Sequence, residues 1–180
     1  MATINLLPNA DVSNDWTLST GSDVYALLDE DTTGWIGFDG SKLTTTSVGD
    51  GFVVDLQDFT EAHSSIDGVQ AVVRAGNNGR GRTFKIKTRL LDEASPAGIY
   101  YDEDSATQGA SVTYRTVTFT NRTTSDGSSA WTNANINDLR MRVDLSAHSG
   151  GTTRFTYCYF IITYTEPTVS DNAVFFGCNF

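Results

Sequence analysis

The sequence has few cysteines, prolines and basic residues, and it has no long apolar run. Its two cysteines, Cys158 and Cys178, are too few for a disulfide framework and lack zinc-site spacing, so we expect free thiols and a reducing compartment. No segment is apolar for long enough to cross a bilayer, and the first residues do not resemble a signal peptide. These absences indicate a protein that folds in the cytoplasm.

Basic residues are outnumbered, with 12 Lys and Arg against 22 Asp and Glu, which gives a net charge of -10. This charge repels nucleic acid and anionic membranes, so we expect neither as a partner. The 180 residues suffice for one domain with its own hydrophobic core.

What the sequence does contain is a strand pattern, because β-branched and aromatic residues alternate with polar ones between Gly, Asn, Asp and Ser clusters. The predicted strands are Thr3–Leu7, Asp15–Ser19, Val24–Leu28, Lys42–Val48, Phe52–Leu56, Gly68–Ala75, Thr83–Leu91, Ile99–Tyr101, Val112–Thr120, Leu139–Leu145 and Thr153–Thr165. Several of these have one apolar face, which predicts an all-β, antiparallel β-sandwich of jelly-roll type. A short helical turn is expected near Thr132–Asn137.

A set of sequence features resembles a known family. They are Trp131 to Leu139 followed by an alternating strand, the turn at Gly150 and Gly151, the last strand ending at Glu166, the strand pair Ile66–Ala75 and Arg82–Leu91, and the early Leu7–Ala10. Together they resemble small jelly-roll virion proteins of tailed bacteriophages. The resemblance implies a structural protein of the head, a decoration or cement protein that is often trimeric, or in other cases a tail or fibre component. The chain departs from the family pattern by continuing past its last strand.

One acidic loop has some features of a calcium site. Asp29, Asp31 and Thr33 provide oxygen ligands at alternate positions before Gly34. The twelfth position, where a calcium loop has a bidentate Glu, is Gly40, and helices are not predicted on either side. The default interpretation is a solvated acidic turn, with calcium as the alternative, and no other cofactor is expected.

No complete set of catalytic residues is present. His63 lies beside Ser64 and Ser65, and His148 lies near Ser146 and Ser149, but neither group has a nucleophile-elbow context. Acidic pairs such as Asp102 and Asp104 have the residue types of a glycosidase, but their separation is not readable from sequence. We therefore expect a protein that is not an enzyme, with a polysaccharide-cleaving enzyme as the weakest alternative.

Half of the basic residues gather on one predicted hairpin: Arg74, Arg80, Arg82, Lys85, Lys87 and Arg89. The glycine-rich turn within it has no phosphate-loop spacing and is interpreted as a hairpin connection. The basic cluster is open to two interpretations. It is either a docking face for an acidic partner or a wet face balanced by neighbouring carboxylates.

Aromatic residues support an alternative function, because sugar rings stack on exposed aromatic faces. The candidates are Trp35, Tyr100, Tyr101, Tyr157 and Tyr159, of which Tyr100 and Tyr101 are the predicted glycan contacts. Trp16 and Trp131 lie beside turn signals and are expected to pin loops onto the sandwich.

Both ends of the chain are expected to be arms, residues 1–11 and 167–180, around a sandwich of residues 12–166. The arms carry Ile4, Leu6 and Leu7 at one end and Val174, Phe175, Phe176 and Phe180 at the other. Burial of each such side chain contributes on the order of 1.5–3 kcal/mol before ordering costs. An apolar end either folds back onto its own sandwich or enters a neighbouring subunit.

These observations predict a phage virion protein that decorates or cements the capsid as a homotrimer, with the major capsid protein or another virion protein as its partner. The interface would use the apolar end residues together with Arg80 and Arg82. The alternative prediction is a carbohydrate-binding or receptor-binding module of a phage tail or fibre.

Overall fold

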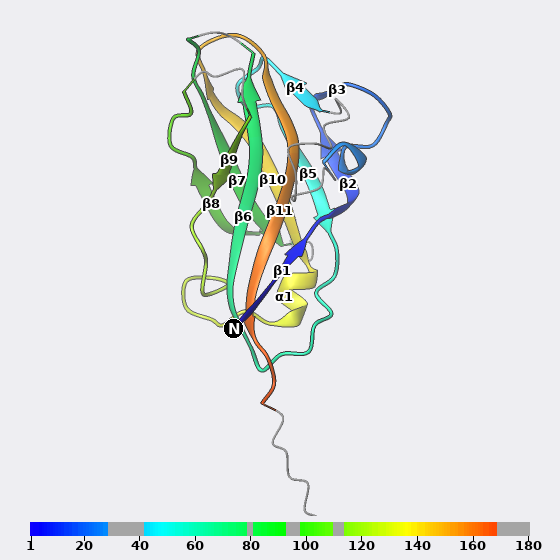
Figure 1. Ribbon diagram of the computed structural model, residues 1–180, viewed down its shortest axis with the longest axis vertical. Helices are drawn as coiled ribbons and strands as arrows, with labels where there is room; N and C mark the ends of the chain where they lie inside the picture. Colours follow the sequence, from blue (N-terminus) through cyan, green and yellow to red (C-terminus); the bar gives the residue numbers. More distant parts are fainter. Residues whose placement is uncertain (29–41, 79–80, 93–97, 110–113, 169–180) are drawn as a thin grey trace, which may run out of the picture.

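Two antiparallel β-sheets packed face to face make up the protein (Figure 1). The computed structural model describes residues 1–28, 42–78, 81–92, 98–109 and 114–168. Sheet A has the order β3 (Thr17–Leu18), β4 (Leu43–Thr45), β11 (Thr153–Thr165), β6 (Ser65–Asn77) and β9 (Arg115–Thr118), and β1 (Ala2–Leu6) also pairs with β11. Sheet B has the order β2 (Pro8–Asn14), β5 (Gly51–Leu56), β10 (Leu139–His148), β7 (Phe84–Asp92) and β8 (Ile99–Asp104).

The all-β antiparallel sandwich with one short helical turn confirms the predicted fold class. Successive strands pass from one sheet to the other at most connections, as in a jelly roll. The helical turn is α1 (Asn133–Asn137), and Thr132 and Asn135 form a capping box at its start. Among the described residues, no helix has the length and apolar character needed to cross a membrane.

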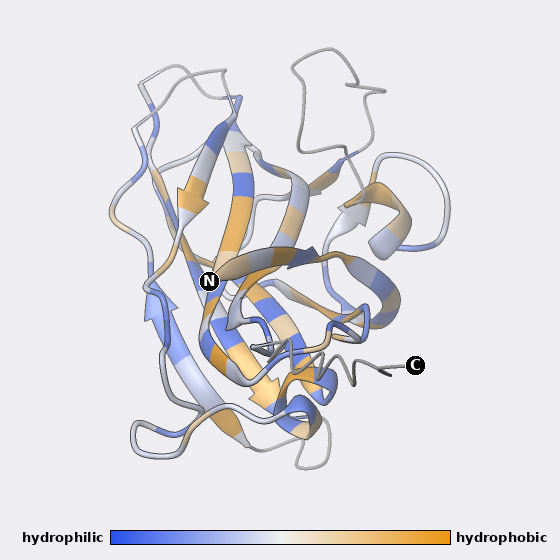
Figure 2. Cartoon of the chain, turned by 60° about the horizontal axis from the view of Figure 1, so that its bottom comes forward, coloured by the Kyte–Doolittle hydropathy of each residue, from blue (hydrophilic) through white to orange (hydrophobic). Residues whose placement is uncertain are grey.

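The core lies between the sheets and is filled by the apolar half of each alternating strand, which Figure 2 shows as orange and blue residues in turn. Phe52 of sheet B and Phe155 of sheet A meet edge to face with ring centroids 5.7 Å apart. Trp16 packs against both rings, 4.5 Å from Phe155 and 6.0 Å from Phe52. Trp16 therefore joins the two sheets.

The N-terminal segment is part of the sandwich rather than an arm. β1 pairs with β11 from Ala2↔Tyr164 to Leu6↔Phe160, and Leu6 is 2% exposed. The chain then crosses to sheet B, where β2 pairs with β5. Of the two fates open to this apolar end, folding back onto its own sandwich is the one that residues 1–11 adopt, because alternating Ala2, Ile4 and Leu6 fit the inner face of a strand.

The structure differs from the predicted strands in two places. The predicted strand Val24–Leu28 is a 3-10 turn, η1 (Tyr25–Leu27), because the carboxylate of Asp11 accepts hydrogen bonds from the backbone N–H groups of Val24 (2.6 Å) and Tyr25 (2.7 Å). β2 was not predicted, because PNADVSN is polar and begins with proline. Such a sequence suits an edge strand, and among the described strands β2 pairs with β5 alone, with two register shifts.

Candidate functional site

The outer face of sheet B is a network of ion pairs. Arg140 binds Asp55 at 2.7 Å, and Lys87 lies 3.4 Å from Asp102 and 3.5 Å from Asp104. Cross-strand neighbours of opposite charge account for this network, because β7 and β10 present cations beside the acids of β5 and β8. The face is therefore neutralised by its own side chains.

The same network decides between the two interpretations of the basic hairpin. Arg89 approaches the buried carboxylate of Asp144 at 3.5 Å, and Arg142 donates to it at 2.7 Å. Arg82 donates a hydrogen bond to the carbonyl oxygen of Ser149 at 2.9 Å. Lys87 and Arg89 therefore belong to a solvent-exposed face whose cations are balanced by neighbouring carboxylates. Arg80 lies outside the described residues.

The outer face of sheet A has a different chemistry. Its outward side chains are tyrosine, threonine, asparagine, glutamine and arginine with two aliphatic residues: Thr3, Asn5, Gln70, Val72, Arg74, Thr116, Thr118, Arg154, Tyr157, Tyr159, Ile161 and Thr163. Among the strand residues of sheet A that the structure describes, Asp67 is the one carboxylate, and it accepts hydrogen bonds from Thr165 (2.6 Å) and Ser65 (2.8 Å). This face offers neutral hydrogen-bonding groups and aromatic rings rather than ion pairs.

A register shift in β11 places two tyrosines on this face. A bulge at Thr156 lets Tyr157 pair with Arg74 and Tyr159 pair with Val72. The two rings therefore lie side by side, with centroids 5.6 Å apart and planes inclined by 33°. Tyr157 is 7% exposed, whereas Tyr159 is partly exposed, and burial beside Tyr157 raises the pKa of Tyr159.

Arg74 lies between two aromatic rings in the centre of the face. Its guanidinium carbon is 5.8 Å from the ring centroid of Tyr114 and 5.7 Å from that of Tyr157. The hydroxyl groups of Tyr157 and Thr116 are 3.0 Å apart. Tyr114 itself rests on Gly76, where an added Cβ would lie 3.3 Å from the ring and the backbone. Tyr114, Arg74, Tyr157 and Tyr159 thus form one continuous row, here called the tyrosine row.

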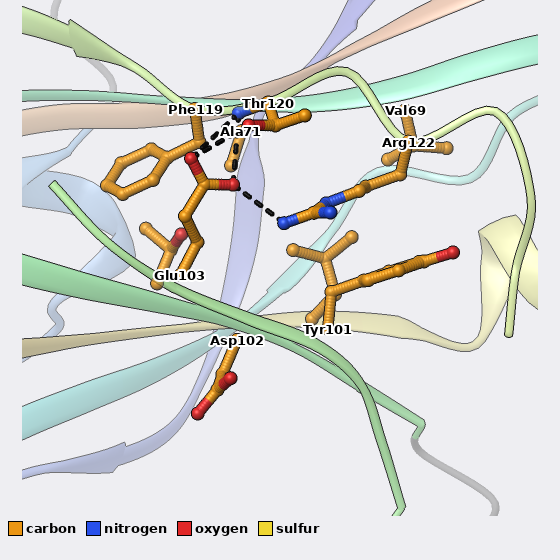
Figure 3. A pocket seen from close by; sticks show the side chains of 10 residues that line it. Val69, Ala71, Tyr101, Asp102, Glu103, Phe119, Thr120 and Arg122 are labelled. Atoms are coloured by element: carbon orange, nitrogen blue, oxygen red, sulfur yellow. Dashed lines mark hydrogen bonds and ion pairs between the residues drawn. The ribbon is translucent and has the colours of Figure 1, made fainter. Parts of the chain in front are cut away.

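A small pocket opens between the sheets at the β8 and β9 edge, and Figure 3 shows its lining. Its free volume is ≈ 10 Å³, about the room that one water molecule takes. Glu103 points into it and accepts hydrogen bonds from the N–H (3.1 Å) and hydroxyl (2.9 Å) of Thr120 and from Arg122 (2.8 Å). The hydrogen bonds of Glu103 hold the two sheets together at this pocket, which is too small for a sugar ring.

The predicted glycan contacts Tyr100 and Tyr101 lie near this pocket, and both contact other residues of the protein. Both rings pack against Trp131, with centroids 5.6 and 6.5 Å away, and Arg122 stacks on Tyr101 at 4.5 Å. The hydroxyl of Tyr101 donates to the carbonyl oxygen of Thr124 at 2.7 Å, and Asn135 donates to the hydroxyl of Tyr100 at 3.3 Å. They pin a loop and α1 to the sandwich, and their contact with a glycan stays a prediction.

Catalytic arrangements are not found where the residue types suggested them. In the part of the chain that the structure describes, Nδ1 of His63 bonds to the carbonyl oxygen of Glu61 (2.8 Å) and Nε2 of His148 bonds to that of Gly151 (2.9 Å), and neither ring bonds to a serine. Asp102 and Asp104 share Lys87 on the outside of sheet B, and Figure 3 shows Asp102 pointing away from Glu103. His63 and His148 are not among the residues that line the pocket of Figure 3, and Asp102, which is one of them, pairs with Lys87 beside a pocket too small for a sugar ring.

The predicted calcium ligands Asp29, Asp31 and Thr33 lie outside the described residues. Within the described ranges, no group of three or more His, Cys, Asp or Glu side chains has an arrangement that would hold a metal ion. Cys158 is a buried free thiol, and burial raises its pKa. Cys158 is therefore a structural residue of the core.

The predicted interface residues that the structure describes do not form one surface. Ile4 and Leu6 pack against the protein's own core, and Leu7 is half-buried at the crossing from β1 to β2. Arg82 donates a hydrogen bond to the carbonyl oxygen of Ser149, in the turn between β10 and β11. Val174, Phe175, Phe176 and Phe180 lie outside the described residues, so their intersubunit burial stays a prediction.

No protein-family model and no curated protein sequence matches the chain. Solved structures similar to it include a truncated AlyQ with CBM32 and alginate lyase domains, at 16% identity and a TM-score of 0.48, covering 92% of this chain and 34% of that one. Another is the xylan-binding module CBM15, at 13% identity and a TM-score of 0.43, covering 92% and 99%. A third is the Clostridium thermocellum endo-1,4-beta-D-xylanase 10B CBM22-1-GH10 structure, at 15% identity and a TM-score of 0.46, covering 92% and 28%.

These neighbours contain carbohydrate-binding modules rather than phage virion proteins, which corrects the expected function. The prediction of a capsid decoration or cement protein is wrong, and so is the prediction of a capsid partner. The burial of Ile4 and Leu6 within their own domain removes part of the physical basis for cementing. The resemblance to phage proteins and a virion location stay predictions.

Sequence reasoning named Tyr157, Tyr159 and Arg74 separately but did not bring them together. The bulge at Thr156 breaks the alternation of β11, so the shared face of Arg74 and Tyr157 is not readable from period-two spacing alone. Arg154 and Tyr114 were missed. The signal that points to them is the scarcity of acids in the strands of sheet A, which becomes visible only when the strand order is known.

Proposed function

We propose that the protein is a non-catalytic carbohydrate-binding module that holds a polysaccharide chain against the outer face of sheet A. The observation that carries this proposal is the tyrosine row, which ends in the partly exposed ring of Tyr159. Sugar rings present C–H faces that stack on aromatic rings, and their hydroxyl groups need neutral donors and acceptors. Both kinds of group are present together on this face.

The shape of the sheet suits a chain rather than a single sugar. β6 and β11 run side by side for 13 residues each, and Figure 1 shows them as the two long neighbouring strands of the front layer. Side chains two residues apart on a strand are about 6.6 Å apart, so successive rows are spaced on the scale of successive sugar rings. Thr116, Thr118 and Gln70 lie beside the tyrosines and offer hydrogen bonds.

The test compares retention of the protein by a panel of insoluble and gel-embedded polysaccharides. We expect retention by at least one of them and its loss in Tyr159→Ala, with unchanged circular dichroism, because Tyr159 is only partly buried. Tyr25→Ala is the matched control, since Tyr25 is also half-buried but lies in η1 beside β2. Retention that survives Tyr159→Ala but disappears in folded Tyr100→Ala would move the site to β8 and contradict the proposal.

A further inference from the structure

We propose that the bound polysaccharide carries carboxylate groups, as polymers that contain uronic acid units do. This inference rests on the proposed function, because it concerns the same face of sheet A, and it adds the charge of the ligand. The observations that carry it are the distribution of acidic residues between the sheets and the position of two arginines on the outer face.

Acidic residues are segregated between the two sheets. Strands of sheet B contain seven: Asp11, Asp55, Asp92, Asp102, Glu103, Asp104 and Asp144. The described strands of sheet A contain one acidic residue, Asp67, at the end of β6 far from the tyrosine row. They contain three basic residues, Arg74, Arg115 and Arg154. In a chain with a net charge of -10, this leaves one sheet whose strands are locally positive. An anionic polymer would approach that sheet and be repelled elsewhere.

Arg154 is placed to meet such a polymer. It is half-buried on β11 and lies opposite Gly76 of β6 and Thr44 of β4, so neither cross-strand neighbour is charged. Among the described residues it has no ion pair, and its buried Nε has no hydrogen-bond partner. A guanidinium that is partly desolvated without a counter-charge is stabilised when a carboxylate binds it.

Arg74 lies one row further along the same face. Gly76 pairs with Arg154, and Arg74 is two residues before Gly76 on β6, so both arginines point outward from adjacent rows. The rings of Tyr114 and Tyr157 flank the guanidinium of Arg74 and limit its rotamers, which reduces the entropy lost when it binds a ligand. Two like charges this close repel each other, and an anionic sugar unit lying over them would offset the repulsion.

The planar fork of a guanidinium matches the planar carboxylate of a uronic acid, so recognition depends on geometry as well as charge. The face therefore combines a ring for stacking, that of Tyr159, with two guanidinium groups that can each bind a carboxylate, those of Arg74 and Arg154. A neutral polysaccharide would stack on the ring and leave the two guanidinium groups without a role.

The experiment measures binding to polygalacturonate, to the same polymer after chemical reduction of its carboxyl groups, and to dextran sulfate. We expect the carboxylated polymer to bind at least about 10-fold more tightly than its reduced form, and more weakly as salt is raised. Arg154→Gln and Arg74→Gln should each lose about 10-fold or more on the carboxylated polymer. Lys85→Gln on sheet B is the control with the same change in net charge, and it should leave binding unchanged.

Three outcomes would overturn the inference. Equal binding of the reduced polymer, with no effect of Arg154→Gln, would show a neutral ligand while leaving the proposed function intact. Tighter binding to dextran sulfate, equally weakened by Lys85→Gln, would show attraction by net charge rather than recognition by the two arginines. Failure to bind any polysaccharide in either test would remove the proposed function and this inference together. Arg154→Lys, which keeps the charge but not the fork, should bind with intermediate affinity if the protein recognises a carboxylate.

Discussion

The guanidinium of Arg74 lies over the ring of Tyr157, with its central carbon 5.7 Å from the ring centroid. This contact joins the two long strands β6 and β11 on their outer side, because the two residues are cross-strand partners. A cation over an aromatic ring contributes about 0.5–1 kcal/mol at exposed sites and more when it is desolvated. The contact therefore supports the sheet and orders the residues beside the proposed ligand.

Tyr157 is expected to act as a support rather than as the principal sugar contact. Tyr157→Phe removes the hydrogen bond to Thr116 and keeps the ring under Arg74, so it should lower the free energy of unfolding by about 1 kcal/mol and leave polysaccharide affinity nearly unchanged. Denaturant unfolding and retention by the polysaccharide check both parts. A stable Tyr157→Phe variant that no longer binds would show that this hydroxyl touches the sugar.

The N-terminal strand should be needed for stability of the isolated domain. Leu6 is 2% exposed and packs in the core, so Leu6→Ala should cost about 2–5 kcal/mol. Asn5→Ala, on the exposed side of the same strand, is the control and should cost less than about 0.5 kcal/mol. Equal and small effects of both changes would indicate that β1 is a detachable arm.

Gly68 should accept a methyl group once the exposed side chain of Asn121 moves aside. A Cβ at Gly68 would lie 2.3 Å from Oδ1 of Asn121, whose side chain covers that glycine. Because Asn121 is exposed and its amide is the end of a flexible side chain, Gly68→Ala should destabilise the fold by less than about 1 kcal/mol. The double variant Gly68→Ala with Asn121→Ala should recover part of that loss, which a double-mutant cycle measures. Strictly additive effects would show that the two residues do not meet.

Stability should fall in alkaline solution. Burial raises the pKa of Cys158 above its ordinary 9.0 and the pKa values of Tyr100 and Tyr159 above their ordinary 10.0. Groups whose pKa is higher in the folded state bind protons more tightly there, so their contribution is complete below the unfolded-state value and is lost as pH rises through the folded-state value. The free energy of unfolding should be level near neutral pH and decline above about pH 9.

Denaturant unfolding between neutral pH and alkaline pH checks this expectation. In Cys158→Ala the decline should begin nearer pH 10, where only the tyrosines contribute. A free energy of unfolding that stays constant across the whole range would contradict the burial of these groups.

Much of the fold was predictable from the sequence, and the reason is visible in individual strands. Phe84, Ile86 and Leu90 alternate with Lys85, Lys87 and Arg89, and β7 places them on opposite sides as expected. The turn at α1 was predictable from its capping residues. β2 and η1 were not, because the carboxylate of Asp11 and the pairing to β5 are tertiary features that override weak local propensity.

The candidate site was less predictable than the fold. Arg74 was grouped with the hairpin cations that follow it in the chain, yet it lies on sheet A, whereas Lys87 and Arg89 lie on sheet B. Tyr100 and Tyr101 satisfied the residue-type criterion for sugar stacking, but tertiary packing against Trp131 and Arg122 engages them. Sheet membership, which sequence spacing does not encode, decides which side chains share a face.

The most direct test of the central claim is to titrate the isotope-labelled protein with soluble fragments of a polysaccharide that it retains and to follow the backbone amide signals by nuclear magnetic resonance. We expect the changes to gather on β6, β9 and β11 around Tyr159, Arg74 and Thr118. Changes gathered on sheet B, or around Tyr100 and α1, would contradict it.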